Sequence, residues 1–151
     1  MVEINVRHVI YLKIDSHSFR YEMSIEITGV IYTHRITDSH STGSELQIFQ
    51  ILSGICGRGA ADRVRLVTTM WDEVDDQSTA EQTEDRLKDE WRSLLNAGAS
   101  YQRFTNSSES AWDIVRGLGY ERKALLLQVE LVDGTKLERT TAGRHAPGDA
   151  V

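Results

Sequence analysis

The chain has 151 residues, enough for one domain with a sizeable core, and its net charge of −6 argues against a nucleic-acid partner, which needs a basic face. The sequence has no apolar run near the roughly 20 residues of a membrane span, and we expect no signal peptide at its start. The single cysteine, Cys56, fits a reducing compartment, so we expect an intracellular, cytoplasmic protein.

The N-terminal third of the sequence predicts two strands and a helix. Residues Val2–Ile14 alternate at first and then become uniformly apolar, which is typical of a strand. Ile27–Thr33 predicts a second strand, and its apolar residues on both faces make it central in a sheet. A Thr-x-x-Glu capping pattern at 42–45 then predicts a helix over 43–56.

The middle of the sequence predicts another central strand at Val64–Thr69 and a long helix over 79–96. A Ser-x-x-Glu capping pattern at 78–81 indicates where that helix begins. Glu84 and Lys88 form an i,i+4 pair, which we place on the solvent side. The apolar stripe of the helix has four members: Leu87, Trp91, Leu94 and Leu95.

The last third begins with a short strand predicted at Tyr101–Phe104 and a helix capped at Asn106. Residues 124–141 are ambiguous: their apolar residues fit a helical stripe, but they also alternate, and Asp133-Gly134 is a hairpin signal. Residues after Ala142 have the pattern of a frayed tail.

The order strand–helix–strand–helix–strand–helix predicts an α/β fold. Two successive βαβ units require a parallel sheet with right-handed crossovers, so we expect a three-layer domain with a three-stranded parallel core. The connection to the N-terminal strand is short, so we expect Val2–Ile14 to pair antiparallel beside the strand at 27–33.

Several segments carry a family resemblance. They are Thr28–Asp38, Val67–Val74, Arg103–Asn106, Ser110-Ala111, Glu130–Asp133 and Thr141–Gly143. In these segments the chain resembles the C-terminal half of fungal P-loop GTPase-like proteins, relatives of septins and of the immune-associated nucleotide-binding GTPases. The resemblance covers 21–143, with a non-matching segment at 1–20 and a tail at 144–151. It implies a partial doubly wound, P-loop NTPase-like domain, and it favours a helix after Ala124.

The resemblance also implies a nucleotide-base site. The family's guanine-specificity motif reads Asn/Thr-Lys-x-Asp, and this sequence has Thr69, Met70, Trp71 and Asp72 in its place. A carboxylate at the end of a strand can accept two hydrogen bonds from the N1 and N2 edge of guanine. Met70 can cover the base but lacks the charge of the lysine, and Asn106 lies where the family's next loop closes over the base. GTP or GDP is the ligand that the resemblance implies.

A polar box of the family corresponds to His34, Arg35 and Asp38. These residues could contact a nucleotide or a second subunit, or they could simply cap the following helix. His34 and Asp38 together with His40 could suggest a metal, but their spacing matches no standard site, and we expect no metal there.

The phosphate-binding motifs are missing from the sequence. A P-loop needs Gly-x-x-x-x-Gly-Lys-Ser/Thr, but the nearest spacing, Gly54 to Gly59, is followed by two alanines. No Asp-x-x-Gly motif is present either. We therefore expect a truncated or degenerate GTPase-like protein, inactive on its own, with weak or no GTP binding and with Mg²⁺ only if the missing half were present.

The alternative is a non-catalytic interaction module that uses the GTPase-like surface. Self-association through that face or through the sheet edge is the partner that we expect.

Overall fold

A computed structural model describes the protein over residues 29–38, 45–57, 59–118 and 124–146. Three strands form one parallel sheet, in the order β1 (Val30–Arg35), β2 (Val64–Thr69) and β3 (Ser100–Arg103). The protein is therefore an α/β fold with a three-stranded parallel sheet, as the alternation of strands and helices predicts. The predicted pairing of Val2–Ile14 concerns residues outside the described ranges.

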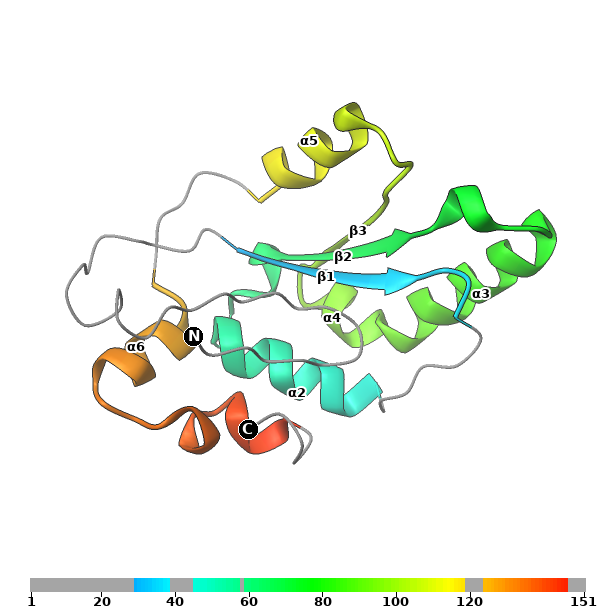
Figure 1. The fold of residues 1–151 in the computed structure, drawn as a ribbon. Coiled ribbons are helices and arrows are strands. Elements are labelled where there is room, and N and C mark those ends of the chain that lie inside the picture. The colour runs from blue at the N-terminus through cyan, green and yellow to red at the C-terminus, as the bar shows by residue number, and fades with distance from the viewer. Residues whose placement is uncertain (1–28, 39–44, 58, 119–123, 147–151) are drawn as a thin grey trace.

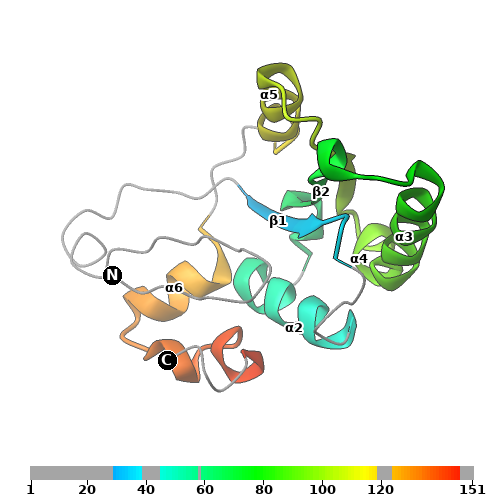
Figure 2. The same cartoon turned by 45° about the vertical axis from the view of Figure 1, so that its right-hand side comes forward.

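Five α-helices are present in the described residues, and they lie on both sides of the sheet. They are α2 (Glu45–Cys56), α3 (Gln77–Glu90), α4 (Arg92–Asn96), α5 (Ser108–Arg116) and α6 (Leu126–Val132). Helices α2, α3 and α4 lie on one side and α5 lies on the other, and a 45° turn of the view preserves this arrangement (Figures 1 and 2). Among the described residues, no helix is both long and apolar enough to cross a membrane.

The strand predictions are confirmed, with small shifts at the strand ends. β2 has its predicted bounds. β1 runs two residues beyond its predicted end because His34 pairs with Thr68 and Arg35 with Thr69. β3 begins and ends one residue early, although the N–H of Phe104 still donates to the Thr68 carbonyl at 2.8 Å.

The helix predicted over 79–96 begins earlier than expected and is interrupted. Asp76, not Ser78, is its N-cap, and the Asp76 carboxylate accepts from the Ser78 N–H at 3.1 Å. The interruption falls at Trp91, between α3 and α4. Gly98 follows α4 with φ 115°, as expected of a residue that ends a helix in the left-handed conformation.

Trp91 is the centre of the core on the side of the sheet that α3 and α4 cover. Its side chain is 2% exposed and meets the sheet beneath α3 and α4. The Tyr32 ring is 5.9 Å away edge-on, the His34 ring 6.1 Å and the Tyr101 ring 6.2 Å. Such aromatic contacts add to the stabilisation that burial provides. The predicted stripe is confirmed, since Leu87 and Leu94 are also buried.

The opposite face of the sheet packs against the end of α5. A Cβ added to Gly117, directly after that helix, would lie 2.9 Å from Arg65 Nε on β2. Val67 of β2 and Ile114 of α5 are buried, at 2% and 5% exposure. The face is otherwise only half-buried at Ile31 of β1. The two faces of the sheet are therefore covered very unequally within the described residues.

The ambiguous segment 124–141 forms α6 and a short 3₁₀ helix (Leu137–Arg139), so the hairpin alternative is wrong. Gln128 accepts from the Leu125 N–H at 3.0 Å and caps the helix. Gly134, with φ 85°, ends it just after Asp133. The Asp-Gly pair is thus a helix C-terminus, which uses the same left-handed glycine as a hairpin turn does.

The frayed tail predicted after Ala142 is wrong for residues 143–145, which pack on α2. Residues Gly143–His145 form a 3₁₀ helix, and Gln47 Nε2 donates to the His145 carbonyl at 3.1 Å. The approach is close, since a Cβ on Gly54 would lie 2.6 Å from the Ala142 nitrogen. Only glycine allows this backbone contact.

Candidate functional site

The β2–α3 loop leaves the sheet at the carboxyl end of its middle strand, where open α/β sheets bind ligands. Thr69 ends β2, and its hydroxyl donates to the His34 carbonyl at 3.4 Å. Met70 follows with φ 63° and ψ 33°, and its side chain is 36% exposed. A left-handed conformation is costly for a residue with a long side chain. The structure around Met70 must therefore hold this turn in place.

The β3–α5 loop provides the second side of the site. Asn106 has φ 56°, and its Nδ2 donates to Asp72 Oδ2 at 3.2 Å, with both side chains exposed. Within the described ranges, Met70 and Asn106 are the non-glycine residues with positive φ. Strained backbone of this kind concentrates at functional sites. Asn106 does not cap α5 as predicted, because Ser107 is the N-cap.

The structure thus brings together four of the predicted base-site residues, Thr69, Met70, Asp72 and Asn106, at one end of the sheet. Asp72 belongs to a short 3₁₀ helix (Trp71–Glu73) that turns the chain directly after Met70. The arrangement offers an exposed carboxylate, an exposed amide and an apolar side chain.

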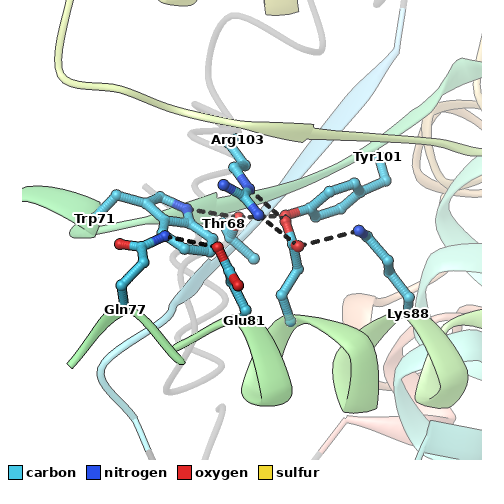
Figure 3. A network of polar contacts seen from close by, with 8 residues as sticks. Thr68, Trp71, Gln77, Glu81, Lys88, Tyr101 and Arg103 are labelled. Carbon is cyan, nitrogen blue, oxygen red and sulfur yellow. Dashed lines mark hydrogen bonds and ion pairs between the residues drawn. The ribbon is translucent and has the colours of Figure 1, made fainter. Parts of the chain in front are cut away.

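A polar network that includes Trp71 of this loop lies between the sheet and α3 (Figure 3). We call it the Glu84 network, and its members are Thr68, Trp71, Glu84, Lys88, Tyr101 and Arg103. Trp71 Nε1 donates to Thr68 Oγ1 at 2.9 Å, and the Thr68 and Tyr101 hydroxyl groups are 2.8 Å apart. The Arg103 guanidinium lies over the Trp71 ring, 4.0 Å from its centre. Nearby on α3, Gln77 donates to Glu81 at 3.2 Å.

Glu84 is the centre of that network. Its carboxylate accepts two hydrogen bonds from Arg103, at 2.6 and 2.7 Å, and one from the Tyr101 hydroxyl, and it forms an ion pair with Lys88 at 3.1 Å. The hydrogen bonds from Arg103 are the main reason that the pKa of Glu84 falls from 4.5 to about 2. The same partner raises the pKa of Arg103, and burial, followed by the bond to Glu84, raises that of Tyr101.

The predicted Glu84–Lys88 pair exists, but its place on the solvent side is wrong. The Glu84 side chain is 5% exposed, because Arg103 and Tyr101 reach it from β3. Only a weak signal for these partners is present in the sequence. Tyr101 and Arg103 are two apart and therefore share a strand face, but only the fold shows that α3 covers that face.

The polar box does not stay together. His34 is 2% exposed and faces the Trp91 ring inside the core. Arg35 is exposed, and it forms an ion pair with Glu73 at 3.7 Å, next to the β2–α3 loop. The N–H of Asp38 donates to the Arg35 carbonyl at 3.1 Å in the turn after β1. Arg35 is thus the member of the box that lies near the candidate site.

Two other chemical groups have structural explanations. Asp76, in the acidic part of the loop, caps α3, and within the described residues no three or more histidine, cysteine or acidic side chains gather in a way that could hold a metal ion. Cys56 is buried at the end of α2, and burial raises the pKa of its thiol to about 11. A thiol with so high a pKa is a poor nucleophile at neutral pH.

The fold and the site define an α/β protein with an exposed polar site at the carboxyl ends of parallel strands. Comparison with known proteins adds no relative: no protein-family model matches the chain, and neither a curated protein nor a solved structure matches it significantly. What the site can bind is therefore judged from its own chemistry.

Proposed function

We propose that this chain is a P-loop GTPase-like protein that binds a purine base, guanine by preference, through Asp72, and that does not hydrolyse GTP by itself. The observation that carries the proposal is the hydrogen bond of 3.2 Å between Asn106 and Asp72. It joins two loops that follow adjacent parallel strands. Asp72 and Asn106, which the resemblance selects, are 34 positions apart in the sequence but are neighbours in space.

The chemistry of these groups suits a flat base with hydrogen-bond donors on its edge. Asn106 occupies one oxygen of the Asp72 carboxylate, and a carboxylate has about four lone-pair positions in total. Room remains to accept the N1–H and the N2–H of guanine, while adenine offers no such pair of donors. Met70, exposed beside them, can cover the face of the base with its apolar side chain.

The topology supports the assignment to P-loop GTPase-like proteins. The guanine-motif segment follows the middle strand of the parallel sheet, and the loop with Asn106 follows the neighbouring strand. Helices lie on both sides of the sheet, as in doubly wound folds (Figure 1). The assignment itself remains our proposal, since the same α/β architecture serves many functions.

The same proposal limits affinity and catalysis. Phosphoryl transfer depends on positioning and on neutralising charge around the phosphates. The sequence contains neither the Gly-x-x-x-x-Gly-Lys-Ser/Thr motif nor an Asp-x-x-Gly motif. Base contacts alone would give a dissociation constant of about 1 mM, equivalent to roughly 4 kcal/mol.

A titration with guanosine and with adenosine, followed by NMR chemical shifts, tests the proposal. We expect guanosine to bind more tightly, and Asp72→Ala to weaken it by about 1–3 kcal/mol, the value of a hydrogen bond to a charged group. Because Asp72 is exposed, its replacement should change the free energy of unfolding by less than about 0.5 kcal/mol. Asp75→Ala, at another exposed carboxylate of the loop, is the control and should leave binding unchanged.

Two results would contradict the proposal. Equal affinity for the two nucleosides, or full affinity in Asp72→Ala, would remove Asp72 from base recognition. Phosphate release from GTP and Mg²⁺ above background, abolished in Asp72→Ala, would refute the expected inactivity.

The second candidate function is an interaction module that associates with a second copy of the chain. Within the described residues β1 is an edge of the sheet, paired only with β2. Strand edges present unpaired backbone groups that can pair with another chain. A light-scattering mass that rises with protein concentration, together with no nucleoside binding, would favour this candidate, and a constant monomer mass would rule it out.

A further inference from the structure

Trp71 is built into the protein differently from its two neighbours in the β2–α3 loop. Met70 and Asp72 are exposed, whereas Trp71 is half-buried, and its indole edge is attached to β2 by the hydrogen bond to Thr68 at 2.9 Å. The Trp71 side chain therefore belongs to the Glu84 network, as Figure 3 shows, while the side chains of Met70 and Asp72 are exposed to solvent.

Arg103 holds the face of that indole. Its guanidinium lies 4.0 Å from the ring centre, within the range of a cation–π contact. The guanidinium is itself fixed by two hydrogen bonds of 2.6 and 2.7 Å to the two oxygens of Glu84. A planar fork can stack on a ring and bind a carboxylate at two points simultaneously, and lysine cannot do both. Helix α3 therefore orients an arginine of β3, which in turn covers a tryptophan of the loop.

The loop needs such support because its backbone is strained at Met70, where φ is 63°. A non-glycine residue persists in this conformation only where its surroundings enforce it. Trp71 directly follows Met70 and directly precedes Asp72, so fixing its ring fixes the direction in which both neighbours project.

We propose that Arg103, held by Glu84, is a positioning residue for the β2–α3 loop, and that through Trp71 it sets the conformation in which Met70 and Asp72 meet the base. The identity of the ligand rests on the function proposed above, whereas the effect on the loop is independent of it. Arg103 does not itself need to touch the ligand.

The test measures the loop and the ligand separately. In Arg103→Met the side chain can neither stack as a cation nor pair with Glu84. We expect the Trp71 indole N–H, assigned by its loss in Trp71→Phe, to exchange with deuterium at least about tenfold faster. The NMR signals of the Met70 and Asp72 amides should broaden, and the dissociation constant for guanosine should rise about fivefold, the value of one such contact.

Lys88→Met is the matched control. Lys88 also pairs with Glu84, at 3.1 Å, but the ring that it covers is that of Tyr101, at 4.8 Å. If the network were merely structural, Arg103→Met and Lys88→Met would both be less stable. Measured well below the melting temperatures, the NMR signals of the loop would then be the same in the two variants. We expect the loop signals and guanosine affinity to change in Arg103→Met only.

A second variant keeps the inference testable if Arg103→Met does not fold. Arg103→Lys retains a positive charge opposite Glu84 but loses the planar fork. It should also accelerate exchange of the Trp71 indole proton. Unchanged exchange in both arginine variants, or an equal change in Lys88→Met, would overturn the inference. Absence of guanosine binding by the unmodified protein would refute the proposed function instead, and the exchange rates would still decide the role of Arg103.

Discussion

The Glu84 network, which includes Trp71 of the β2–α3 loop, joins β2, β3 and α3 through a buried carboxylate that accepts three hydrogen bonds and pairs with Lys88. At the rim of the same loop, Asp72 and Asn106 share one exposed hydrogen bond of 3.2 Å. Buried charge-assisted bonds are costly to break, whereas exposed ones exchange readily with water. The difference teaches that the Glu84 network and the exposed pair can be changed separately: mutations in the network should alter stability, and mutations in the pair should alter the base binding that we propose.

The largest expected effect on stability comes from the Glu84 network. Glu84→Ala removes the central carboxylate, and we expect the free energy of unfolding to fall by about 2 kcal/mol, since Arg103 is partly exposed and can regain water. Urea denaturation measures it. Glu81→Ala, at an exposed residue less than one turn earlier on α3, is the control and should change stability by less than about 0.5 kcal/mol. Equal losses of unfolding free energy in the two variants would show that the Glu84 network contributes no more to stability than the exposed surface of α3 does.

The Glu84 network should also make the stability of the protein depend on pH in the acid range. The pKa of Glu84 is lowered from 4.5 to about 2 in the folded protein, so the folded state favours the charged form. Its contribution is therefore complete above about pH 5 and is lost as the pH falls towards 2.

Glu84→Gln should abolish this acid-sensitive part, worth about 1–2 kcal/mol of the stability at pH 7. Urea denaturation between pH 7 and pH 2 measures the free energy of unfolding of the unmodified protein and of Glu84→Gln. We expect the difference between the two values to become smaller as the pH falls. A difference that stays constant over that range would show that the charge of Glu84 is not responsible.

The smallest expected effect on stability is at Met70, in the exposed part of the β2–α3 loop. Replacing an ordinary residue by glycine usually destabilises a protein by about 0.5–1 kcal/mol, because the unfolded chain gains freedom. At φ 63° glycine also relieves strain, so we expect Met70→Gly to change stability by less than about 0.5 kcal/mol while it weakens guanosine binding. Calorimetric melting and the guanosine titration check both parts. A stability loss well above 1 kcal/mol would show that the Met70 side chain belongs to the core.

The sequence was sufficient to predict the sheet, because apolar strands alternate with amphipathic helices. Val64–Thr69 has its predicted bounds, and Trp91 and Leu87 are buried on the predicted stripe. The local errors have a common cause. Ser78 and Asn106 have the chemistry of N-caps, but Asp76 and Ser107 were equally suitable and stand where the chain turns. Propensity identifies candidates for a cap, and only the path of the chain selects among them.

The family resemblance selected Asp72 and Asn106, which the structure places within hydrogen-bond distance, whereas no feature of the sequence predicted the Glu84 network. Asp72 and Asn106 stand directly after strands, where ligand-contacting residues are expected. Glu84 has an ordinary helical partner in Lys88, which hides its contact with Arg103, 19 positions away. A buried ion pair between a helix and a strand depends on how the helix is rotated over the sheet, and no short-range pattern encodes that rotation.

The close contact of Gly54 with Ala142 has a practical consequence for shortening the protein. Because a Cβ at Gly54 would lie 2.6 Å from the Ala142 nitrogen, the surface of α2 is shaped to receive that backbone. An expressed fragment that ended before Ala142 would uncover the part of α2 around Gly54. In the intact protein the short helix Gly143–His145 should accordingly resist protease digestion.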